Sequence, residues 1–313
     1  MRGPVVPAAG RGLVPAGVYR FGIELALAID VGGTKLAAGL VTPGGELVAR
    51  STAPTPATDD AEEVFAVLLA VADAVDGDGD VIACGVGCGG PMSAGGGEVS
   101  PLNIPAWRGF PLRTRLSGAL GVPTWVDNDA KALALGEGWR GAAAGCEDYI
   151  AMVVSTGVGG GLVLDGRLLH GAQGNAGHIG HVNVEPDGRR CGCGAHGCLE
   201  AEASGTSIAA ITGHPAQEAG PDVVARTGTL VGRAVASVAN LLDLPLAVVG
   251  GSVALGFGEP FFAAARAELG RQARLAFSEG ARIVPVGLGD TGPLIGAGAV
   301  AWRHLRDQKL LGE

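Results

Sequence analysis

The stretch ELALAIDVGGTKLAAGLVTPGGELVAR (residues 24–50) has three apolar segments, separated by a Gly-Gly-Thr turn and a Pro-Gly-Gly turn. Apolar runs bounded by glycine and proline are typical of β-strands. A second stretch, DYIAMVVSTGVGGGLVLDGRLLHG (residues 148–171), repeats this pattern. The repetition predicts two related α/β lobes with a ligand cleft between them. Because hairpins with glycine turns are common, two unrelated hairpins are the alternative.

Helical and strand signals between these stretches support an α/β fold. Residues 59–75 (DDAEEVFAVLLAVADAV) place acidic residues in the first turn and apolar residues at helical spacing. The run VIACGVG (residues 81–87) is typical of a buried strand. The run NDAKALALGEGWRG (residues 128–141) begins with an Asn-Asp pair suited to capping a helix.

The composition bounds the class of protein. A chain of 313 residues can form two domains, and 47% apolar with 17% charged residues indicates a globular protein. A net charge of −9 disfavours nucleic acid as a partner. No run of 18 apolar residues predicts a transmembrane helix, and residues 1–24 lack the apolar core of a secretion signal. We therefore expect a flexible tail over residues 1–24, no membrane partner and a cytoplasmic location.

Three glycine-rich loops each follow an apolar strand: DVGGTK (residues 30–35), STGVGGG (residues 155–161) and VVGGSVA (residues 248–254). Backbone amides in such turns can approach an anion. A carboxylate at Asp30 suits a hydrated metal better than a bare phosphate. Any one loop alone can be a hairpin turn, but three together favour a nucleotide site.

Two nucleotide motifs do not apply. The run GVGCGG (residues 85–90) matches the dinucleotide pattern, but a proline and more glycines follow it where a helix is required. The P-loop pattern is absent because the chain contains no Gly-Lys pair.

The segment PTWVDNDAKAL (residues 123–133) places Asp127, Asn128 and Asp129 where a predicted strand ends. Ligands collect at such strand ends in α/β folds. Phosphoryl transfer to an alcohol needs a carboxylate that accepts its proton, and Asp129 is the candidate, with Asn128 holding a neighbouring hydroxyl. Helix capping is the alternative, and it accounts for one of the three residues.

The segment HVNVEPDGRRCGCGAHGC (residues 181–198) offers one imidazole and three thiolates to a metal. A closed tetrahedral set of this type predicts structural zinc, held by His181, Cys191, Cys193 and Cys198, and excludes a zinc hydrolase, which needs an open position. Disulfides or free thiols are the alternative, and His178 and His196 are rival ligands. The metal would hold Glu200 at the cleft.

Taken together, several motifs resemble the ROK family (repressors, open reading frames, kinases), in particular its bacterial glucokinases. They are DVGGTK, LNIPAW, VDNDA, STGVGGG, GHIGHVNV and CGCGAHGCLEAEASG. The resemblance implies a two-lobed, actin-like ATPase fold of the ribonuclease H type, with ATP and Mg²⁺. It implies lobes over residues 25–136 and 137–291, a zinc loop over 178–200, a C-terminal helix over 292–313, and a homodimer or homotetramer.

The resemblance also assigns roles to single residues. Asp129 matches the catalytic base. The residues at the family's sugar-binding positions are Asn103, Asn128, Asp129, His181 and Glu200, and His178 occupies one more position of this kind. The phosphate loops match Asp30, Gly33, Thr34, Lys35, Thr156 and Gly157, and the adenosine loop matches Gly250 and Gly251.

Two departures from the family pattern touch sugar recognition. The family's GEIGH is GHIGH here, so His178 replaces a glutamate, and Gly89-Gly90 replaces a Pro-Gly pair. An imidazole accepts at most one of the two hydrogen bonds that a carboxylate accepts. We therefore expect transfer of the ATP γ-phosphate to the 6-hydroxyl of glucose, or of an analogue altered near C2 or C3.

The alternatives are a kinase of antibiotic pathways acting on 3-amino-3-deoxyglucose (kanosamine) or a C7 cyclitol, and a non-catalytic sugar-sensing regulator. A regulator of this family needs a DNA-binding domain before the first glycine loop. Only 29 residues precede Asp30, and we expect an enzyme.

Overall fold

The two repeated stretches each form a three-stranded antiparallel meander in the computed structural model, which describes residues 22–311. The first stretch gives β1 (Glu24–Val31), β2 (Lys35–Val41) and β3 (Leu47–Pro54). The second stretch gives β6 (Tyr149–Val154), β7 (Val158–Leu164) and β8 (Arg167–Leu168). Residues 1–21 of the predicted tail lie outside the described residues.

Each meander is extended by two parallel strands. The first sheet adds β4 (Asp80–Cys88) and β5 (Thr124–Asn128), and the second adds β9 (Leu246–Gly250) and β10 (Arg282–Pro285). Read from the meander, the orders are β3-β2-β1-β4-β5 and β8-β7-β6-β9-β10. The two sheets therefore share one topology, which confirms the duplication. Two unrelated hairpins would not account for the matching positions of the two added parallel strands.

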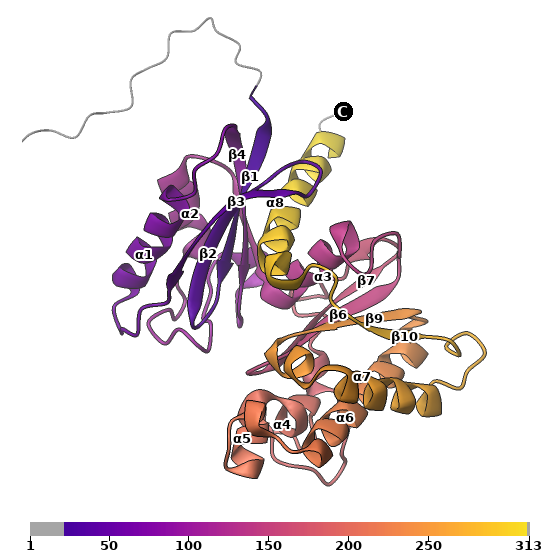
Figure 1. Ribbon diagram of the computed structural model, residues 1–313. Coiled ribbons are helices and arrows are strands. Elements are labelled where there is room, and N and C mark those ends of the chain that lie inside the picture. The colour runs from indigo at the N-terminus through magenta and orange to yellow at the C-terminus, as the bar shows by residue number, and fades with distance from the viewer. Residues whose placement is uncertain (1–21, 312–313) are drawn as a thin grey trace, which may run out of the picture.

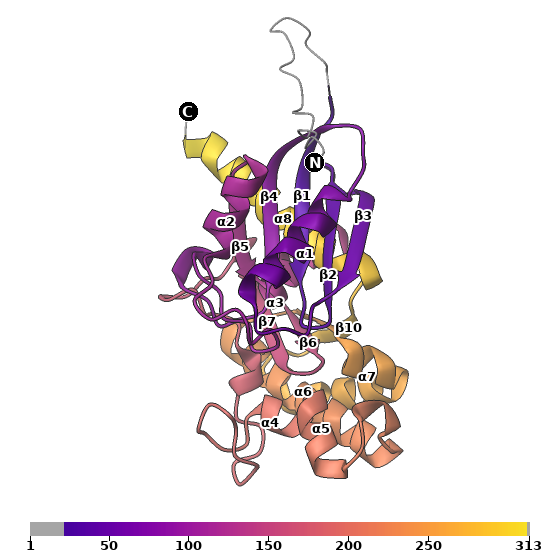
Figure 2. The same ribbon diagram turned by 90° about the vertical axis from the view of Figure 1, so that its left-hand side faces the viewer.

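Helices cover both faces of each sheet (Figures 1 and 2). On the first sheet, α1 (Ala61–Asp73) and α2 (Leu112–Leu120) pack on one face and α8 (Gly292–Leu311) on the other. On the second sheet, α6 (Pro221–Leu242) and α7 (Ser252–Gln272) cover one face and α3 (Asp129–Arg140) the other. The short helices α4 (Leu199–Ala203) and α5 (Gly205–Thr212) lie beside α6 in the second lobe.

The predicted helix over residues 59–75 is α1, and its ends follow from the sequence. The Asp60 carboxylate accepts a hydrogen bond from the Glu62 N–H at 2.8 Å and so caps the helix. Val64, Phe65 and Leu68 recur at helical spacing and are buried against the sheet.

Helix α3 connects the two lobes. It follows β5 of the first sheet, yet it packs against β6 and β7 of the second sheet and against α8. Close packing on β7 requires glycine at Gly161, where a Cβ would lie 2.8 Å from the Cβ of Ala134. The predicted boundary between lobes, at residue 136, falls inside this helix.

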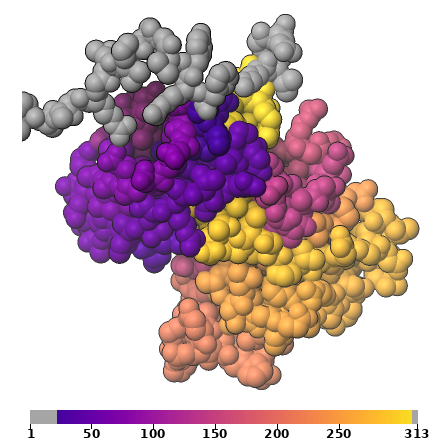
Figure 3. Space-filling view, turned by 45° about the horizontal axis from the view of Figure 1, so that its top comes forward, coloured from indigo at the N-terminus to yellow at the C-terminus, as the bar shows by residue number. Residues whose placement is uncertain are grey.

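The C-terminal helix α8 returns to the first lobe and contacts β1 and β4. Figure 3 shows this yellow segment between the indigo first lobe and the orange second lobe. Its Trp302 is buried and donates an indole hydrogen bond to the Val41 carbonyl at 3.1 Å. Within residues 22–311, none of the helices has the length and apolar character needed to cross a membrane.

Candidate active site

A cleft of about 790 Å³ lies where the strands of both sheets meet their glycine-rich loops. It takes residues from the loop after β1, from the start of α3 after β5, and from the loop after β6. The predicted site residues that line it are Gly33, Thr34, Asn103, Asn128, Asp129, Thr156, Gly157, His178, His181 and Glu200. The structure thus brings together side chains from distant parts of the chain at the strand ends, as the sequence predicted.

Asp129 is the first residue of α3 and stands on the cleft wall. The capping alternative is confirmed for its neighbour: the Asn128 side chain accepts a hydrogen bond from the Ala130 N–H at 3.1 Å. Asp129 Oδ1 accepts from the same N–H at 2.8 Å. Asp129 Oδ2 lies 4.0 Å from where a Cβ of Gly89 would stand. Glycine at this point keeps the space next to the carboxylate open.

Asp30 and Asp129 lie on either side of β4. In the parallel register, Asp30 of β1 is opposite Gly87, and Gly87 is opposite Asp127 of β5. A Cβ at Gly87 would lie 3.9 Å from Asp30 Oδ1 and 3.7 Å from the Asp129 Cα. The two carboxyl groups are therefore neighbours: Asp129 lines the cleft, and Asp30 is partly buried behind it.

This arrangement raises the pKa of both groups. Burial, and then the Asp129 charge, raise the pKa of Asp30 to about 7, against the opposing effect of Lys35. Burial raises the pKa of Asp129 above its ordinary value, while the hydrogen bond from the Ala130 N–H lowers it. A raised pKa brings a carboxylate closer to the range in which it is an effective proton acceptor.

The first glycine loop is in close contact with the segment that carries Asn103. A Cβ at Gly33 would lie 2.3 Å from the Asn103 Cβ, so only glycine fits there. Gly33 and Thr34 therefore form one cleft wall together with Asn103. Asp30 and Lys35, also predicted for this loop, do not line the cleft: Asp30 lies at the end of β1 and Lys35 begins β2.

The other two glycine loops lie against each other. Gly251 follows β9 with φ +97°, and a Cβ there would lie 2.3 Å from the Val154 carbonyl oxygen at the end of β6. The hydroxyls of Ser155 and Ser252 are 2.9 Å apart. The third loop thus contacts the second through Ser252 and Ser155, and Gly250 and Gly251 are not among the residues that line the cleft.

Glu200 connects the zinc loop to the second glycine loop. Its Oε2 accepts a hydrogen bond from the Val158 N–H at 2.9 Å. A Cβ at Gly157 would lie 2.9 Å from the same oxygen, so glycine permits this approach. The sequence predicted that Glu200 would lie at the cleft, and this bond fixes its orientation there.

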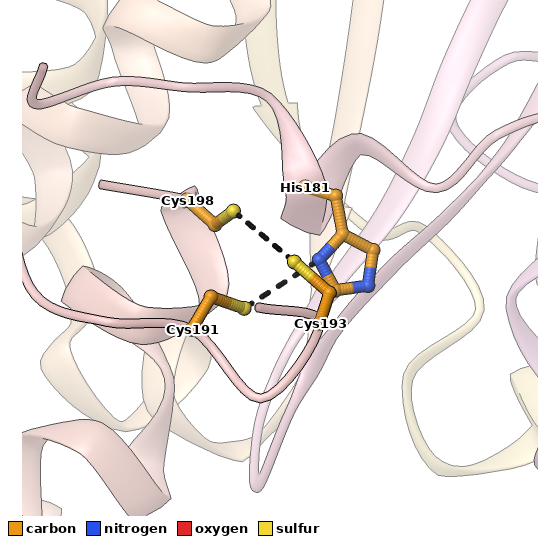
Figure 4. Close-up of side chains that lie close together, drawn as sticks. All are labelled: His181, Cys191, Cys193 and Cys198. Carbon is orange, nitrogen blue, oxygen red and sulfur yellow. Dashed lines mark hydrogen bonds between the residues drawn. The ribbon is translucent and has the colours of Figure 1, made fainter. Parts of the chain in front are cut away.

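The four predicted metal ligands form one cluster (Figure 4). His181 Nδ1 and the three sulfurs of Cys191, Cys193 and Cys198 all lie within 4.8 Å of one another. The Cys193 and Cys198 sulfurs are 3.7 Å apart, and Cys191 Sγ is 3.7 Å from His181 Nδ1. A tetrahedral zinc ion with bonds of about 2.0–2.3 Å requires edges of about 3.5–3.8 Å. The donor set therefore fits zinc, and the rival residues His178 and His196 are not part of it.

A buried carboxylate outside the metal cluster also fixes the position of the zinc loop. The buried Glu202 carboxylate accepts a hydrogen bond at 2.7 Å from the Arg189 guanidinium and another at 2.6 Å from Arg226 of α6. The Arg189 N–H also donates to Glu202. Sequence reasoning missed this pairing, although an acidic residue so close to the last cysteine was a visible signal.

His178 lines the cleft at the position where the family pattern has glutamate. Its ring centroid lies 6.1 Å from that of His181. Burial, together with the neighbouring His181 and Lys131, lowers the pKa of His178, so its imidazole is neutral near pH 7. A neutral ring offers one donor and one acceptor, whereas a carboxylate offers acceptors alone.

Lys131 and Asn175 also line the cleft, and sequence reasoning did not single them out. Lys131 is buried on α3 and lies four residues after Asp127. A lysine on the buried side of a helix was the available signal.

A family model described as "ROK family" matches residues 26–304. The chain belongs to the ROK family. The fold is accordingly the two-lobed, actin-like ATPase fold, and the chain resembles the family's sugar kinases, glucokinase among them.

Two curated relatives carry kinase names. Glucokinase of Halalkalibacterium halodurans is 39% identical over 192 residues, which are 58% of this chain and 57% of the relative. That match spans just over half of the relative's length. N-acetylmannosamine kinase of Escherichia fergusonii is 37% identical over 250 residues, which are 74% of this chain and 84% of the relative.

Two solved structures of ROK family proteins share the fold of this chain. A ROK family glucokinase from Streptomyces griseus, in complex with glucose and AMPPNP, aligns with a TM-score of 0.75 and 30% identity, covering 89% of this chain and 99% of that one. A ROK family transcriptional regulator, a homologue of the E. coli MLC protein, aligns with a TM-score of 0.77 and 25% identity, covering 92% and 80%. The fold alone therefore does not separate a kinase from a regulator.

Proposed function

We propose that this chain is an ATP-dependent sugar kinase that transfers the γ-phosphate to the 6-hydroxyl of glucose or of a glucose analogue. One observation carries the proposal: the Asp129 carboxylate stands in a cleft that also contains two glycine loops, at Gly33–Thr34 and Thr156–Gly157. A regulator needs a sugar pocket but no proton acceptor beside a phosphate site. The names of the kinase relatives, and the glucose and AMPPNP bound by the S. griseus structure, support the same activity.

In this proposal the glycine loops bind the phosphates of ATP, and Asp129 acts on the alcohol. The backbone amides and hydroxyls of Thr34 and Thr156 bind the phosphates of ATP. Asp30 would hold a hydrated Mg²⁺ ion, which would supply positive charge to the phosphates. The Asp129 carboxylate orients the 6-hydroxyl and accepts its proton as the oxygen bonds to the γ-phosphorus and ADP leaves.

The sugar is held by groups around Asp129. Asn128 uses its carbonyl oxygen as a helix cap, which leaves its NH₂ group for a sugar hydroxyl. Glu200 uses one oxygen for the Val158 N–H and keeps the other for the sugar. Asn103 and His181 line the same cleft.

Zinc would be held by His181 Nδ1 and the three cysteines, and it would contribute rigidity because four protein ligands leave no open position. His181 also lines the cleft, so its other ring nitrogen is available to the sugar. The loop thus presents His181 and Glu200 in a fixed relation.

The identity of the sugar depends on His178. A buried group that loses its hydrogen-bond partner can change selectivity by orders of magnitude. The two curated relatives are named for glucose and N-acetylmannosamine, which differ at C2. Because His178 offers a donor where the family pattern has only acceptors, an analogue altered at C2 or C3, such as 3-amino-3-deoxyglucose or a C7 cyclitol, is the second candidate.

A coupled ADP-release screen tests the proposal. The panel contains glucose, mannose, their 2-amino, 2-acetamido and 3-amino derivatives, and cyclitols, each with ATP and Mg²⁺. We expect one member to be phosphorylated with a clear preference, and mass spectrometry of the product to locate the phosphate on the 6-oxygen. Sugar binding by calorimetry without ADP release from any member would refute the kinase and favour a sensor.

A further inference from the structure

One buried cation beside the cleft has no part in the reaction proposed above. The Lys131 side chain, on the third residue of α3, is only 3% exposed. Its ammonium donates a hydrogen bond to the Gly174 carbonyl oxygen at 2.6 Å and lies 3.9 Å from Asp127 Oδ1. Because taking an ammonium out of water is unfavourable, these contacts must offset its desolvation.

The carbonyl that Lys131 holds belongs to a tight loop over residues 171–178, between β8 and the zinc loop. The Gly174 N–H bonds back to the Gly171 carbonyl, and the Ala176 N–H to that of His170. Gly174 has φ +79°, and a Cβ there would lie 4.0 Å from the Ala94 Cα in the first lobe. The loop therefore reaches toward the first lobe, and it presents Asn175 and His178 to the cleft.

The donor of this hydrogen bond, Lys131, is held rigidly by α3. Lys131 lies in the first turn of α3, two residues after Asp129. A Cβ at Gly161 of β7 would lie 2.9 Å from the Lys131 Cα, so the helix rests directly on the second sheet. One turn of helix therefore carries both the proposed base and the cation that holds the loop.

We propose that Lys131 is a positioning residue that holds the loop over residues 171–178 at a fixed distance from Asp129 and thereby sets the affinity for the sugar. In this role Lys131 acts through the loop and not on the reacting alcohol or phosphate. The inference rests on the proposed function, because it assigns the loop to sugar binding.

Lys131→Met tests the inference, since methionine keeps most of the apolar side chain and removes the donor. Loss of a charged hydrogen bond predicts a rise of about 10- to 100-fold in the KM for the sugar. The KM for ATP should stay within about twofold. Lys131→Arg, which restores a cation, should recover most of the sugar affinity.

Two further variants separate the hydrogen bond from other effects. Lys131→Met leaves the Asp127 carboxylate without its cation, so the double variant Asp127→Asn/Lys131→Met should keep the raised KM. Arg266→Met is the matched control, because Arg266 also donates to a carbonyl, that of Ile283 at 3.0 Å, far from the cleft in α7. The control should leave both KM values unchanged.

Hydrogen exchange of the protein without substrates gives a readout that does not depend on turnover. In Lys131→Met, amides over residues 171–178 should exchange at least tenfold faster, while those of α6 keep their rates. An unchanged sugar KM together with unchanged exchange would overturn the inference, as would equal losses for sugar and ATP caused by general destabilisation. If the wild type phosphorylates no sugar, the proposed function fails, and hydrogen exchange with calorimetric sugar binding still decides the role of Lys131.

Discussion

Replacing Asp30 by asparagine should stabilise the protein at alkaline pH in the absence of nucleotide and Mg²⁺, while removing kinase activity. Folding buries the Asp30 carboxyl and places it beside Asp129, which together raise its pKa from 3.8 to about 7. The native state then binds more protons than the unfolded chain between these two values. The contribution of Asp30 to the free energy of unfolding is therefore fully present below about pH 4 and is lost as the pH rises to about 7.

The size of the effect follows from the same values. A rise from 3.8 to about 7 corresponds to about 4 kcal/mol of lost folding free energy well above pH 7. Relaxation of the surrounding groups reduces this figure, so we expect Asp30→Asn to gain about 2–4 kcal/mol at pH 8. At about 2 °C per kcal/mol, the melting temperature should rise by about 4–8 °C.

Thermal unfolding monitored at pH 4, 6 and 8 gives the measurement, with Asp78→Asn as the control in the exposed turn before β4. The two variants should melt alike relative to wild type at pH 4 and diverge as the pH rises. An Asp30→Asn protein that gained nothing between pH 4 and pH 8 would refute the reasoning that burial beside Asp129 raises the pKa of Asp30.

Three further predictions concern the reaction and the metal. Asp129→Ala should lower kcat by about 10²- to 10⁴-fold while sugar binding measured by calorimetry persists, and undiminished turnover would rule out its role as base. Cys193→Ser should reduce the zinc measured by metal analysis from about one ion per chain to a small fraction. The control Cys146→Ser, which changes a cysteine outside the cluster, should retain the zinc. A wild-type protein without zinc would contradict the metal site. His178→Glu should raise kcat/KM for glucose relative to the preferred analogue by at least tenfold, with the exposed His214→Glu as control, and an unchanged ratio would show that position 178 does not select the sugar.

Local signals in the sequence were sufficient to predict much of the fold. Glycine turns between apolar runs predicted both meanders. The capping residues Asp60 and Asn128 mark the starts of α1 and α3. The metal ligands could be predicted because three cysteines and a histidine fall within 18 residues and converge with little help from the rest of the chain.

Contacts between distant segments could not be predicted in the same way. Lys131 meets a carbonyl 43 residues further along, and Glu200 meets an N–H 42 residues earlier. Glu202 needs Arg226 from another helix. Each of these pairs depends on how α3, α4 and α6 pack, and nothing in the neighbouring residues specifies the partner. The contact of Gly251 with Val154, 97 residues earlier, is of the same kind, and the role of Gly250 and Gly251 in binding adenosine stays a prediction.

The return of α8 to the first lobe affects how this protein is made. One face of the first sheet, including Ala26, Ala28 and Ala83, is buried largely by residues of the last helix, among them Ala297 and Trp302. A ribosome synthesises the start of that sheet long before it reaches this helix, so the nascent lobe presents an uncovered apolar surface throughout translation. Burial of that surface requires contacts between the two ends of the chain, which form slowly and leave time for aggregation. Cells that express this protein should therefore need chaperones to bind the first lobe until the final helix has left the ribosome.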